Sequence, residues 1–334
     1  RVLAVANRRT PDVALLDDPD RAEQGLTLLG LVALEDPPRD GVQEAIGRCR
    51  RAGIRLALVT GDHPATARAI AAEVGLLTEG AAVVVGADLP ATDEALGELL
   101  DHDGTVVARV TPEDKLRIAR ALQLRGHVVA MTGDGVNDGP ALREADIGVA
   151  MGRSGTDVAR EAADLVLLDD AFPTIVTAVE LGRATASNIR RFLTYHLTDN
   201  VAELTPFALF ALTGGALPLA LTVLMVLALD IGTDLLPALA LGAEPASPRV
   251  MTEPMRSGPL VDLGLLRRAF LVLGPTEATV EMAAFVGVLV LGGWTFGQSP
   301  PAHLLALASG AAFSAVVLGQ LANAFACRSA TRPG

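Results

Sequence analysis

The chain has 334 residues, half of them hydrophobic, and its mean hydropathy of +0.41 is high for a soluble protein. The formal net charge of −12, with few aromatic residues and no basic arm, argues against a nucleic-acid partner. The two cysteines, Cys49 and Cys327, lie far apart and form no Cys-x-x-Cys pair, which argues against a disulfide framework or a cysteine-rich metal cluster. A chain of this length can hold two domains, and its composition changes near residue 200.

The first half of the chain alternates short apolar runs with helix-like segments. We predict strands at residues 25–34, 54–62, 104–110, 127–134 and 146–151, and helices at residues 41–53, 63–76, 111–126 and 140–145. The segment 157–168 ends this half. Strands that alternate with helices are typical of a parallel α/β sheet with helices on both faces.

Thr-Gly-Asp follows two of these strands, at residues 60–62 and 132–134. In a parallel sheet the carboxyl ends of the strands share one edge, so Asp62 and Asp134 are expected to line a common crevice. Glycine turns and Asn137 and Asp138 follow the second copy. Because Mg²⁺ binds through one or two carboxylates together with phosphate oxygens, the pattern predicts a magnesium and phosphate site. A polar turn without a ligand is the alternative.

Lys115 is the only lysine among 27 basic residues, and it stands in the helix predicted at 111–126. A compact ammonium differs from the planar fork of arginine and can neutralise the charge of a transferring phosphoryl group. The position therefore favours a catalytic lysine at the same sheet edge, with chance as the alternative.

The second half is apolar almost throughout. We predict four membrane helices, at residues 192–213, 216–242, 268–292 and 303–327, each near the ~20 residues that cross a bilayer. Arginines precede the first span, separate the second from the third and follow the fourth, whereas the connection at 292–303 has no arginine or lysine. The positive-inside rule then places the α/β half and the C-terminus in the cytoplasm of an integral membrane protein.

Ionisable side chains interrupt these spans. Within a membrane such groups are rare and usually mark an ion path. Pro206 and Pro237 free helix carbonyls that could also bind a cation. Polar contacts between helices are the alternative interpretation, and for Glu277 and Glu281 both interpretations stay open. The acids are Glu203, Asp230, Asp234, Glu277 and Glu281.

Several segments taken together resemble the P-type cation-transporting ATPases: EDPPRDGV, VTGDHPATARAIAAEVGL, ARVTPEDK, MTGDGVNDGPAL and IGVAMGRSGTDVAREAADLVLLDD. The resemblance covers essentially the whole chain. It implies a haloacid-dehalogenase-like phosphorylation domain with a Rossmann-like parallel sheet at residues 21–180. Residues 1–20 would end a nucleotide-binding domain, and residues 181–334 would form an α-helical transmembrane bundle.

The resemblance also implies roles in the phosphorylation domain. Asp134 would hold Mg²⁺ with support from Asp138, and Lys115 would contact the phosphoryl group. Asn137 would orient the site. Thr60, Gly61 and Asp62 would belong to the catalytic loop, and Asp36, Arg39 and Arg109 would contact the cofactor ATP.

LTDNVAELTPF and LALDIGTDLLPA resemble the fifth and sixth membrane helices of the calcium and sodium/potassium branches. The resemblance implies a site for a transported cation, which could be Ca²⁺, Na⁺, K⁺ or H⁺, in a plasma membrane. Asp230 favours the sodium/potassium type, and the absence of Cys-Pro-Cys argues against the heavy-metal branch. The implied ion-site residues are Asn200, Glu203, Asp230, Thr233, Asp234, Gln320 and Asn323.

The sequence departs from the family in several places. It has neither the Asp-Lys-Thr-Gly-Thr motif with the phosphorylated aspartate nor Thr-Gly-Glu, and it has Gly139 in NDGP where the family usually has alanine. We therefore expect the C-terminal part of a pump, which is inactive alone and has the remainder of the pump as its partner. A non-catalytic membrane protein that keeps the fold as a binding or regulatory module is the alternative.

Overall fold

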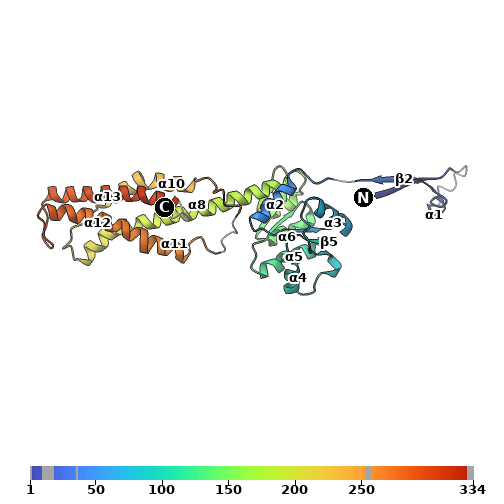
Figure 1. The fold of residues 1–334 in the computed structure, drawn as a ribbon, viewed down its shortest axis with the longest axis horizontal. Helices are drawn as coiled ribbons and strands as arrows, with labels where there is room; N and C mark the ends of the chain where they lie inside the picture. The colour runs from blue at the N-terminus through green and yellow to red at the C-terminus, as the bar shows by residue number, and fades with distance from the viewer. Residues whose placement is uncertain (1, 10–18, 35–36, 253–257, 329–334) are drawn as a thin grey trace.

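A computed structural model describes residues 2–9, 19–34, 37–252 and 258–328. Three parts follow one another along its long axis: an N-terminal hairpin, an α/β body and a helical bundle (Figure 1). Helix α8 (Phe172–Leu212) begins against the body and continues into the bundle, so a single element joins these two parts.

The hairpin is an antiparallel pair of strands, β1 (Val2–Asn7) and β2 (Thr27–Ala33), with the short helix α1 (Pro19–Ala22) between them in the chain. The predicted strand at 25–34 is therefore present, but it pairs with β1 rather than with the sheets of the body. The expected boundary after residue 20 falls between these two strands. All residues of both strands are exposed.

The strands of the body form two parallel sheets of three strands each, with orders β3-β5-β4 and β6-β7-β8. The sequence predicts one sheet, and the described residues contain no strand that joins the two. Strands β3 and β6 each pair on one side only among the described strands. The strands are β3 (Ala57–Thr60), β4 (Val83–Val85), β5 (Thr105–Ala108), β6 (Ala130–Gly133), β7 (Ile147–Met151) and β8 (Leu165–Leu167).

Helices cover both faces of the first sheet, because successive side chains of a strand point to opposite faces. On β5, Val106 packs with α2 (Val42–Arg51) and α3 (Pro64–Glu73). Its neighbour Val107 packs with α4 (Asp93–Leu100) and α5 (Pro112–Leu124). Both valines are fully buried. The second sheet packs against α6 (Gly139–Glu144) and α7 (Asp157–Ala162).

In the body, β4 and α4 fall outside the predicted elements, and the segment 157–168, for which no element was predicted, contains α7 and β8. The two strands are only three residues long, too short for a periodic pattern. Helix α4 has a signal that could have predicted it, since Thr92 caps it and Asp93 and Glu94 stand in its first turn.

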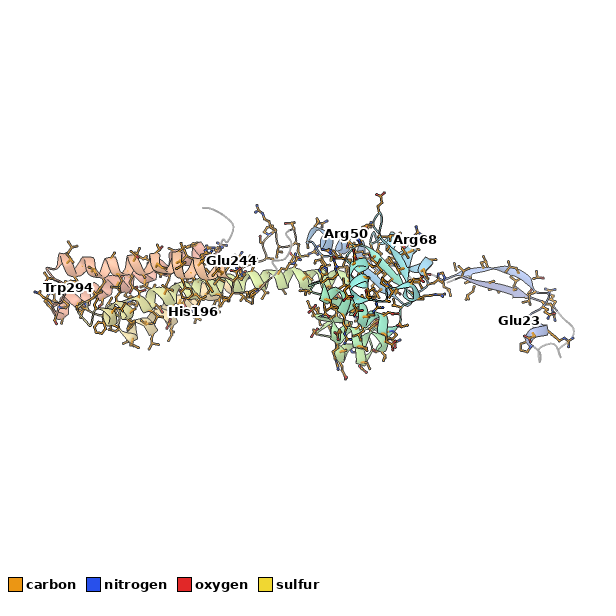
Figure 2. The ribbon with its side chains drawn as sticks, turned by 90° about the horizontal axis from the view of Figure 1, so that it is seen from below. Glu23, Arg50, Arg68, His196, Glu244 and Trp294 are labelled. Atoms are coloured by element: carbon orange, nitrogen blue, oxygen red, sulfur yellow. The ribbon has the colours of Figure 1, made fainter. Side chains whose placement is uncertain are left out.

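Within the described residues, the bundle contains three helices that are long and apolar enough to cross a membrane, at Val223–Gly242, Leu263–Leu291 and Ala302–Arg328. They correspond to three of the four expected spans. The remaining one, at 192–213, lies in the second half of α8, where Asp199, Asn200 and Glu203 lower the hydropathy. The single tryptophan, Trp294, lies at the end of the bundle that is distant from the body (Figure 2).

Two of the three long helices contain a π-helical segment, which often marks a functional site. In the first, η4 (Asp230–Asp234) separates α9 (Val223–Leu229) from α10 (Leu235–Gly242). In the second, η5 (Arg268–Leu273) separates α11 (Leu263–Arg267) from α12 (Gly274–Leu291). The third long helix is α13 (Ala302–Arg328).

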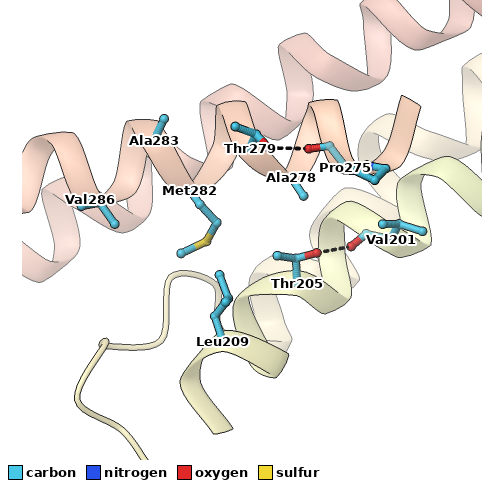
Figure 3. Close-up of a pocket in the computed structure, with 9 residues that line it drawn as sticks. All are labelled: Val201, Thr205, Leu209, Pro275, Ala278, Thr279, Met282, Ala283 and Val286. Carbon is cyan, nitrogen blue, oxygen red and sulfur yellow. Dashed lines mark hydrogen bonds between the residues drawn. The ribbon is translucent and has the colours of Figure 1, made fainter. Parts of the chain in front are cut away.

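A groove of about 540 Å³ lies between α8 and α12 (Figure 3). Its lining is apolar apart from Thr205 and Thr279, whose hydroxyl groups donate to the backbone carbonyls of Val201 and Pro275, each at 2.6 Å. Because both threonine hydroxyl groups are already engaged with the backbone, the groove is a poor candidate for a cation site.

Candidate functional site

The first Thr-Gly-Asp segment forms a self-bonded turn at the carboxyl end of β3. The backbone N–H of Asp62 donates to Thr60 Oγ1 at 3.1 Å, and the Thr60 hydroxyl donates to Asp62 Oδ2 at 3.2 Å. The chain that leaves β5 runs beside this turn, because the backbone N–H groups of Arg109 and Val110 donate to the carbonyls of Asp62 and Thr60. Arg109 has a φ of 53°, so its left-handed backbone makes the sharp exit from β5.

The second Thr-Gly-Asp segment, after β6, is built around Asp138. Its Oδ2 accepts the backbone N–H groups of Gly135 at 3.0 Å and Asp134 at 3.2 Å. Gly133 allows this closure, since a Cβ at that position would lie 2.5 Å from the Asp138 Cβ.

Lys115 reaches the same loop from α5. Its Nζ lies 2.5 Å from Asp138 Oδ1, and Asp138 itself is only 6% exposed. Burial by itself raises the pKa of the Asp138 carboxyl group, but the hydrogen bonds from Lys115, Gly135 and Asp134 outweigh it and hold the pKa below its usual value. The ion pair therefore links α5, which packs on the first sheet, to the loop after β6 of the second sheet.

Asp134 and Asn137 are exposed at this edge. Among the described residues no hydrogen-bond donor or cation engages the Asp134 carboxylate, so its oxygens are available to a metal ion. A single free carboxylate beside a lysine is compatible with Mg²⁺, which takes its other ligands from phosphate and water. Predicted residues are thus gathered in two groups: Thr60, Gly61, Asp62 and Arg109 at the first turn, and Lys115, Asp134, Asn137 and Asp138 at the second.

Of the residues expected to contact ATP, Arg39 stands apart from these turns. Arg39 donates from Nη1 to the backbone carbonyl of Asp170, and Asp36 lies outside the described residues. Asp170 organises the loop after β7. It accepts the backbone N–H groups of Arg153 and Ser154, at 2.9 and 2.8 Å. These bonds lower the pKa of the Asp170 carboxyl group to about 2, and the bond from the Arg153 N–H has the largest effect.

The bundle buries five carboxylic side chains: Asp199, Glu203, Asp234, Glu277 and Glu281 are each at most 6% exposed. Among the described residues, each has at least one oxygen without a hydrogen-bond partner. Buried polar groups normally have partners, so unpaired oxygens indicate a missing ligand or proton. The acids come from α8, η4 and α12.

Polar contacts connect these helices to α13. The Thr233 hydroxyl donates to Gln320 Oε1 at 2.6 Å, and Asn323 Nδ2 donates to Glu277 Oε2. His196 Nδ1 lies 3.3 Å from Asp234 Oδ2. Of the expected ion-site residues, the structure thus buries Glu203, Asp234, Gln320 and Asn323 in the interior of the bundle, and the partly buried Thr233 is bonded to Gln320.

The other two expected ion-site residues are less enclosed. Asn200 is partly buried, and its Nδ2 donates to the His196 carbonyl of its own helix at 2.8 Å. Asp230 is exposed, whereas Asp234 is covered by α8, although the two share one π-helical segment. The negative charge of Asp230 still acts on Glu203.

Asp199 and His196 were missed by the sequence reasoning. Asp199 is 2% exposed, and both its carboxylate oxygens lack a partner among the described residues. Its spacing of four residues from Glu203 puts the two acids on one helix face, so the signal was present. No group of three or more His, Cys, Asp and Glu side chains in the described part of the chain has the spacing to hold a metal ion.

Comparison with known proteins gives matches in both halves of the chain. A family model described as haloacid dehalogenase-like hydrolase matches residues 4–146, and one described as cation transporting ATPase, C-terminus, matches residues 218–334. The sodium/potassium-transporting ATPase subunit alpha-2 of Rattus norvegicus is 42% identical over 298 residues, which are 80% of this chain and 29% of the relative.

Two further relatives are sodium/potassium-transporting ATPase subunits. Alpha-1 of Oreochromis mossambicus is 40% identical over 83% of this chain and 30% of the relative, and alpha-3 of Homo sapiens is 40% identical over 84% of this chain and 30% of the relative. The chain therefore spans about 30% of the length of these relatives. With a haloacid-dehalogenase-like body and an acid-lined helical bundle in one chain, this protein belongs to the P-type cation-transporting ATPases.

Proposed function

We propose that this chain is the part of an ATP-driven cation pump that carries the magnesium and phosphate site and one side of the cation path. The observation that carries the proposal is the continuity of α8. This helix of 41 residues starts against the body, beside Asp170, and its second half contributes Asp199 and Glu203 to the bundle. At 1.5 Å per residue it spans roughly 60 Å, so a displacement in the body can reach the buried acids directly.

In the body, the intact pump would use ATP and Mg²⁺. Asp134 would bind the metal ion, and Lys115, held by Asp138, would neutralise charge on the phosphoryl group. The Thr60–Asp62 turn would offer its hydroxyl and backbone groups to phosphoryl oxygens. The aspartate that accepts the phosphoryl group would come from the remainder of the pump.

Strand pairing supports this division of labour. Strands β3 and β6 each have an unpaired side in the described residues, and each ends in Thr-Gly-Asp. An unpaired edge is a template for another strand. A strand from the remainder of the pump that pairs with both edges would join the sheets and place its carboxyl end between the two turns.

In the bundle, the proposed cation site consists of Asn200, Glu203, Asp230, Thr233, Asp234, Gln320 and Asn323. Na⁺ or K⁺ is favoured over Ca²⁺ and H⁺, since the relatives named above are sodium/potassium-transporting ATPases and Asp230 fits that branch. The proposed location is the plasma membrane, and the distribution of arginine supports an orientation with the body and the C-terminus in the cytoplasm.

The experiment that tests the proposal replaces Asp234 by asparagine in an intact pump that contains this chain. We expect ion-stimulated ATP hydrolysis to be abolished, because the variant loses a buried ligand, whereas phosphorylation by inorganic phosphate remains, because that reaction uses the body. Hydrolysis is measured across Na⁺, K⁺, Ca²⁺ and pH, which also identifies the ion.

Unchanged ion dependence in the variant would contradict the cation site and leave Asp234 as a helix-packing group. The second candidate function, a non-catalytic binding or regulatory module, is favoured only by the absence of Asp-Lys-Thr-Gly-Thr from these 334 residues. It predicts no phosphorylation from ATP or inorganic phosphate even in the intact protein.

A further inference from the structure

Glu277 and Glu281 on α12 face the interior of the bundle with unpaired oxygens. They are 5% and 0% exposed. In the described part of the chain, both carboxylate oxygens of Glu281 and Oε1 of Glu277 lack a hydrogen-bond partner. Such groups are costly at membrane depth unless a proton or a cation compensates them.

The Glu277 side chain is held in a fixed position between α12 and α13. Asn323 Nδ2 donates to its Oε2, which fixes the orientation of both side chains. Gly319 of α13 provides the space: a Cβ there would lie 2.8 Å from Glu277 Oε1 and 2.9 Å from its Cγ. Any larger residue at position 319 would therefore force the carboxylate to move.

The charges around these two glutamates are negative. Glu277 and Glu203 are the charged groups that act on Glu281, and Asp234 is the one that acts on Glu277. Glu277 in turn acts on Asp199 and Glu203. The α12 acids thus belong to the same electrostatic cluster as the acids of α8 and η4. Like charges held in one apolar interior repel, and a cation among them relieves the repulsion.

We propose that Glu277 and Glu281 form a second cation subsite on α12, continuous with the cation site proposed around Glu203 and Asp234, on which it depends. The ligand is a hard cation that binds carboxylate and amide oxygens. Asn323 contributes its Oδ1, because its Nδ2 is engaged with Glu277. No three His, Cys, Asp or Glu side chains of the described residues are grouped to hold a metal ion, so the subsite consists of the two glutamates together with the amide oxygen of Asn323.

The test measures equilibrium binding of radioactive calcium, sodium and rubidium ions to the purified chain in lipid nanodiscs. The variants are Glu277→Gln, Glu281→Gln and Gly319→Ala, the last of which displaces the Glu277 carboxylate without removing a charge. Two matched controls accompany them. Gly310→Ala changes a glycine of the same helix that has no heavy atom within 4 Å of its Cβ position. Glu244→Gln removes a carboxylate that pairs with Arg328 outside the cluster.

A second readout separates cation binding from a structural role. The melting temperature is followed by Trp294 fluorescence with and without the cation that binds best, since a ligand that binds the folded state raises it. We expect each of the three variants to weaken binding by about tenfold or more, which is about 1.4 kcal/mol, and to lose the cation-dependent rise. Both controls should behave as the wild type.

Wild-type affinity and a wild-type thermal shift in all three variants, with both lost in Asp234→Asn, would overturn the α12 subsite and leave the proposed cation site intact. Binding that survives Asp234→Asn but is lost in the α12 variants would contradict the proposed site as assigned and support the subsite. A wild-type chain that binds none of the three ions would overturn both. If one variant does not fold, the other two decide the outcome.

Discussion

Asp138 connects α5 to the loop after β6 through one side chain. Its two oxygens accept from Lys115 and from the backbone N–H groups of Gly135 and Asp134. The carboxylate therefore fixes both the position of the lysine ammonium and the curvature of the loop that presents Asp134. A residue of this kind acts on the proposed phosphate site through its neighbours rather than by contact with a ligand.

The geometry of Lys115 predicts that arginine cannot replace it. The Lys115 side chain is 20% exposed and its ammonium lies 2.5 Å from a buried carboxylate, which leaves little room for a planar fork. In an intact pump, Lys115→Arg should reduce phosphorylation from ATP nearly as much as Lys115→Ala does, a loss on the order of 10²-fold. The phosphoenzyme formed from radiolabelled ATP measures the effect.

Arg120→Lys is the matched control, because Arg120 lies on the same helix and pairs with Glu144 at the surface. Its phosphorylation should stay near that of the wild type. If Lys115→Arg retained most of the phosphorylation, the single lysine would be an accident of composition.

The lowered pKa of Asp138 predicts how the loop responds to acid. Since the pKa of the folded form lies below the unfolded value of about 3.9, the ionised carboxylate stabilises the folded loop above that pH. This contribution is lost as the pH falls through the folded pKa. Hydrogen exchange of the Gly135 amide, corrected for its intrinsic rate, measures it.

Asp138→Asn should expose that amide at neutral pH, and the difference from the wild type should shrink below about pH 4. A difference that is the same at low and neutral pH would show that the charge of Asp138 plays no part in holding the loop.

At the scale of elements, α8 is the connection between the two candidate sites. Arg183 on α8 donates to the Ala52 carbonyl at the end of α2 and to the Val250 carbonyl in the connection after α10. Further along, Arg190 pairs with Asp262 at 2.8 Å. The first half of the helix is thus fastened to the body and to the connection between two membrane helices.

A break in α8 should uncouple the sites. Thr185 is exposed on the helix, so Thr185→Pro removes a helix hydrogen bond and costs about 3 kcal/mol of helix stability without a loss of packing. In an intact pump we expect phosphorylation by inorganic phosphate to remain, whereas stimulation of ATP hydrolysis by the cation disappears.

Thr185→Ala serves as the control, because it changes the same position and keeps the helix continuous. Ion-stimulated hydrolysis by the proline variant at the level of the alanine variant would mean that coupling does not pass through α8.

At the scale of the whole molecule, the body carries the proposed metal and phosphate ligands without the aspartate that would be phosphorylated. Its two sheets present unpaired edges at β3 and β6 among the described strands. The chain by itself should therefore form no acid-stable, hydroxylamine-sensitive phosphoenzyme and show no ATPase activity. Purified chain incubated with radiolabelled ATP tests this, with an intact pump of the family as the positive control. Incorporation of phosphate into the chain would show that it contains a nucleophile of its own.

Most elements of the body could be predicted from the sequence, because apolar strands and amphipathic helices carry clear periods. Which strand each of them pairs with could be predicted less well. Residues 25–34 have the composition of a strand in a buried sheet, yet β2 forms an exposed hairpin with β1. Pairing depends on which edge lies nearby in space, and a local pattern does not contain that information.

The sequence by itself determined the class of this protein: Thr-Gly-Asp at two strand ends, a single lysine, and acids within apolar spans are local features that chemistry can interpret. Only the tertiary structure decided which of these groups meet. It paired Lys115 with Asp138, added Asp199 to the buried acids, left Asp230 exposed, and set Glu277 against Gly319 and Asn323. Residues far apart in the chain are brought together by packing between helices, and that packing depends on the shapes of all the side chains at once.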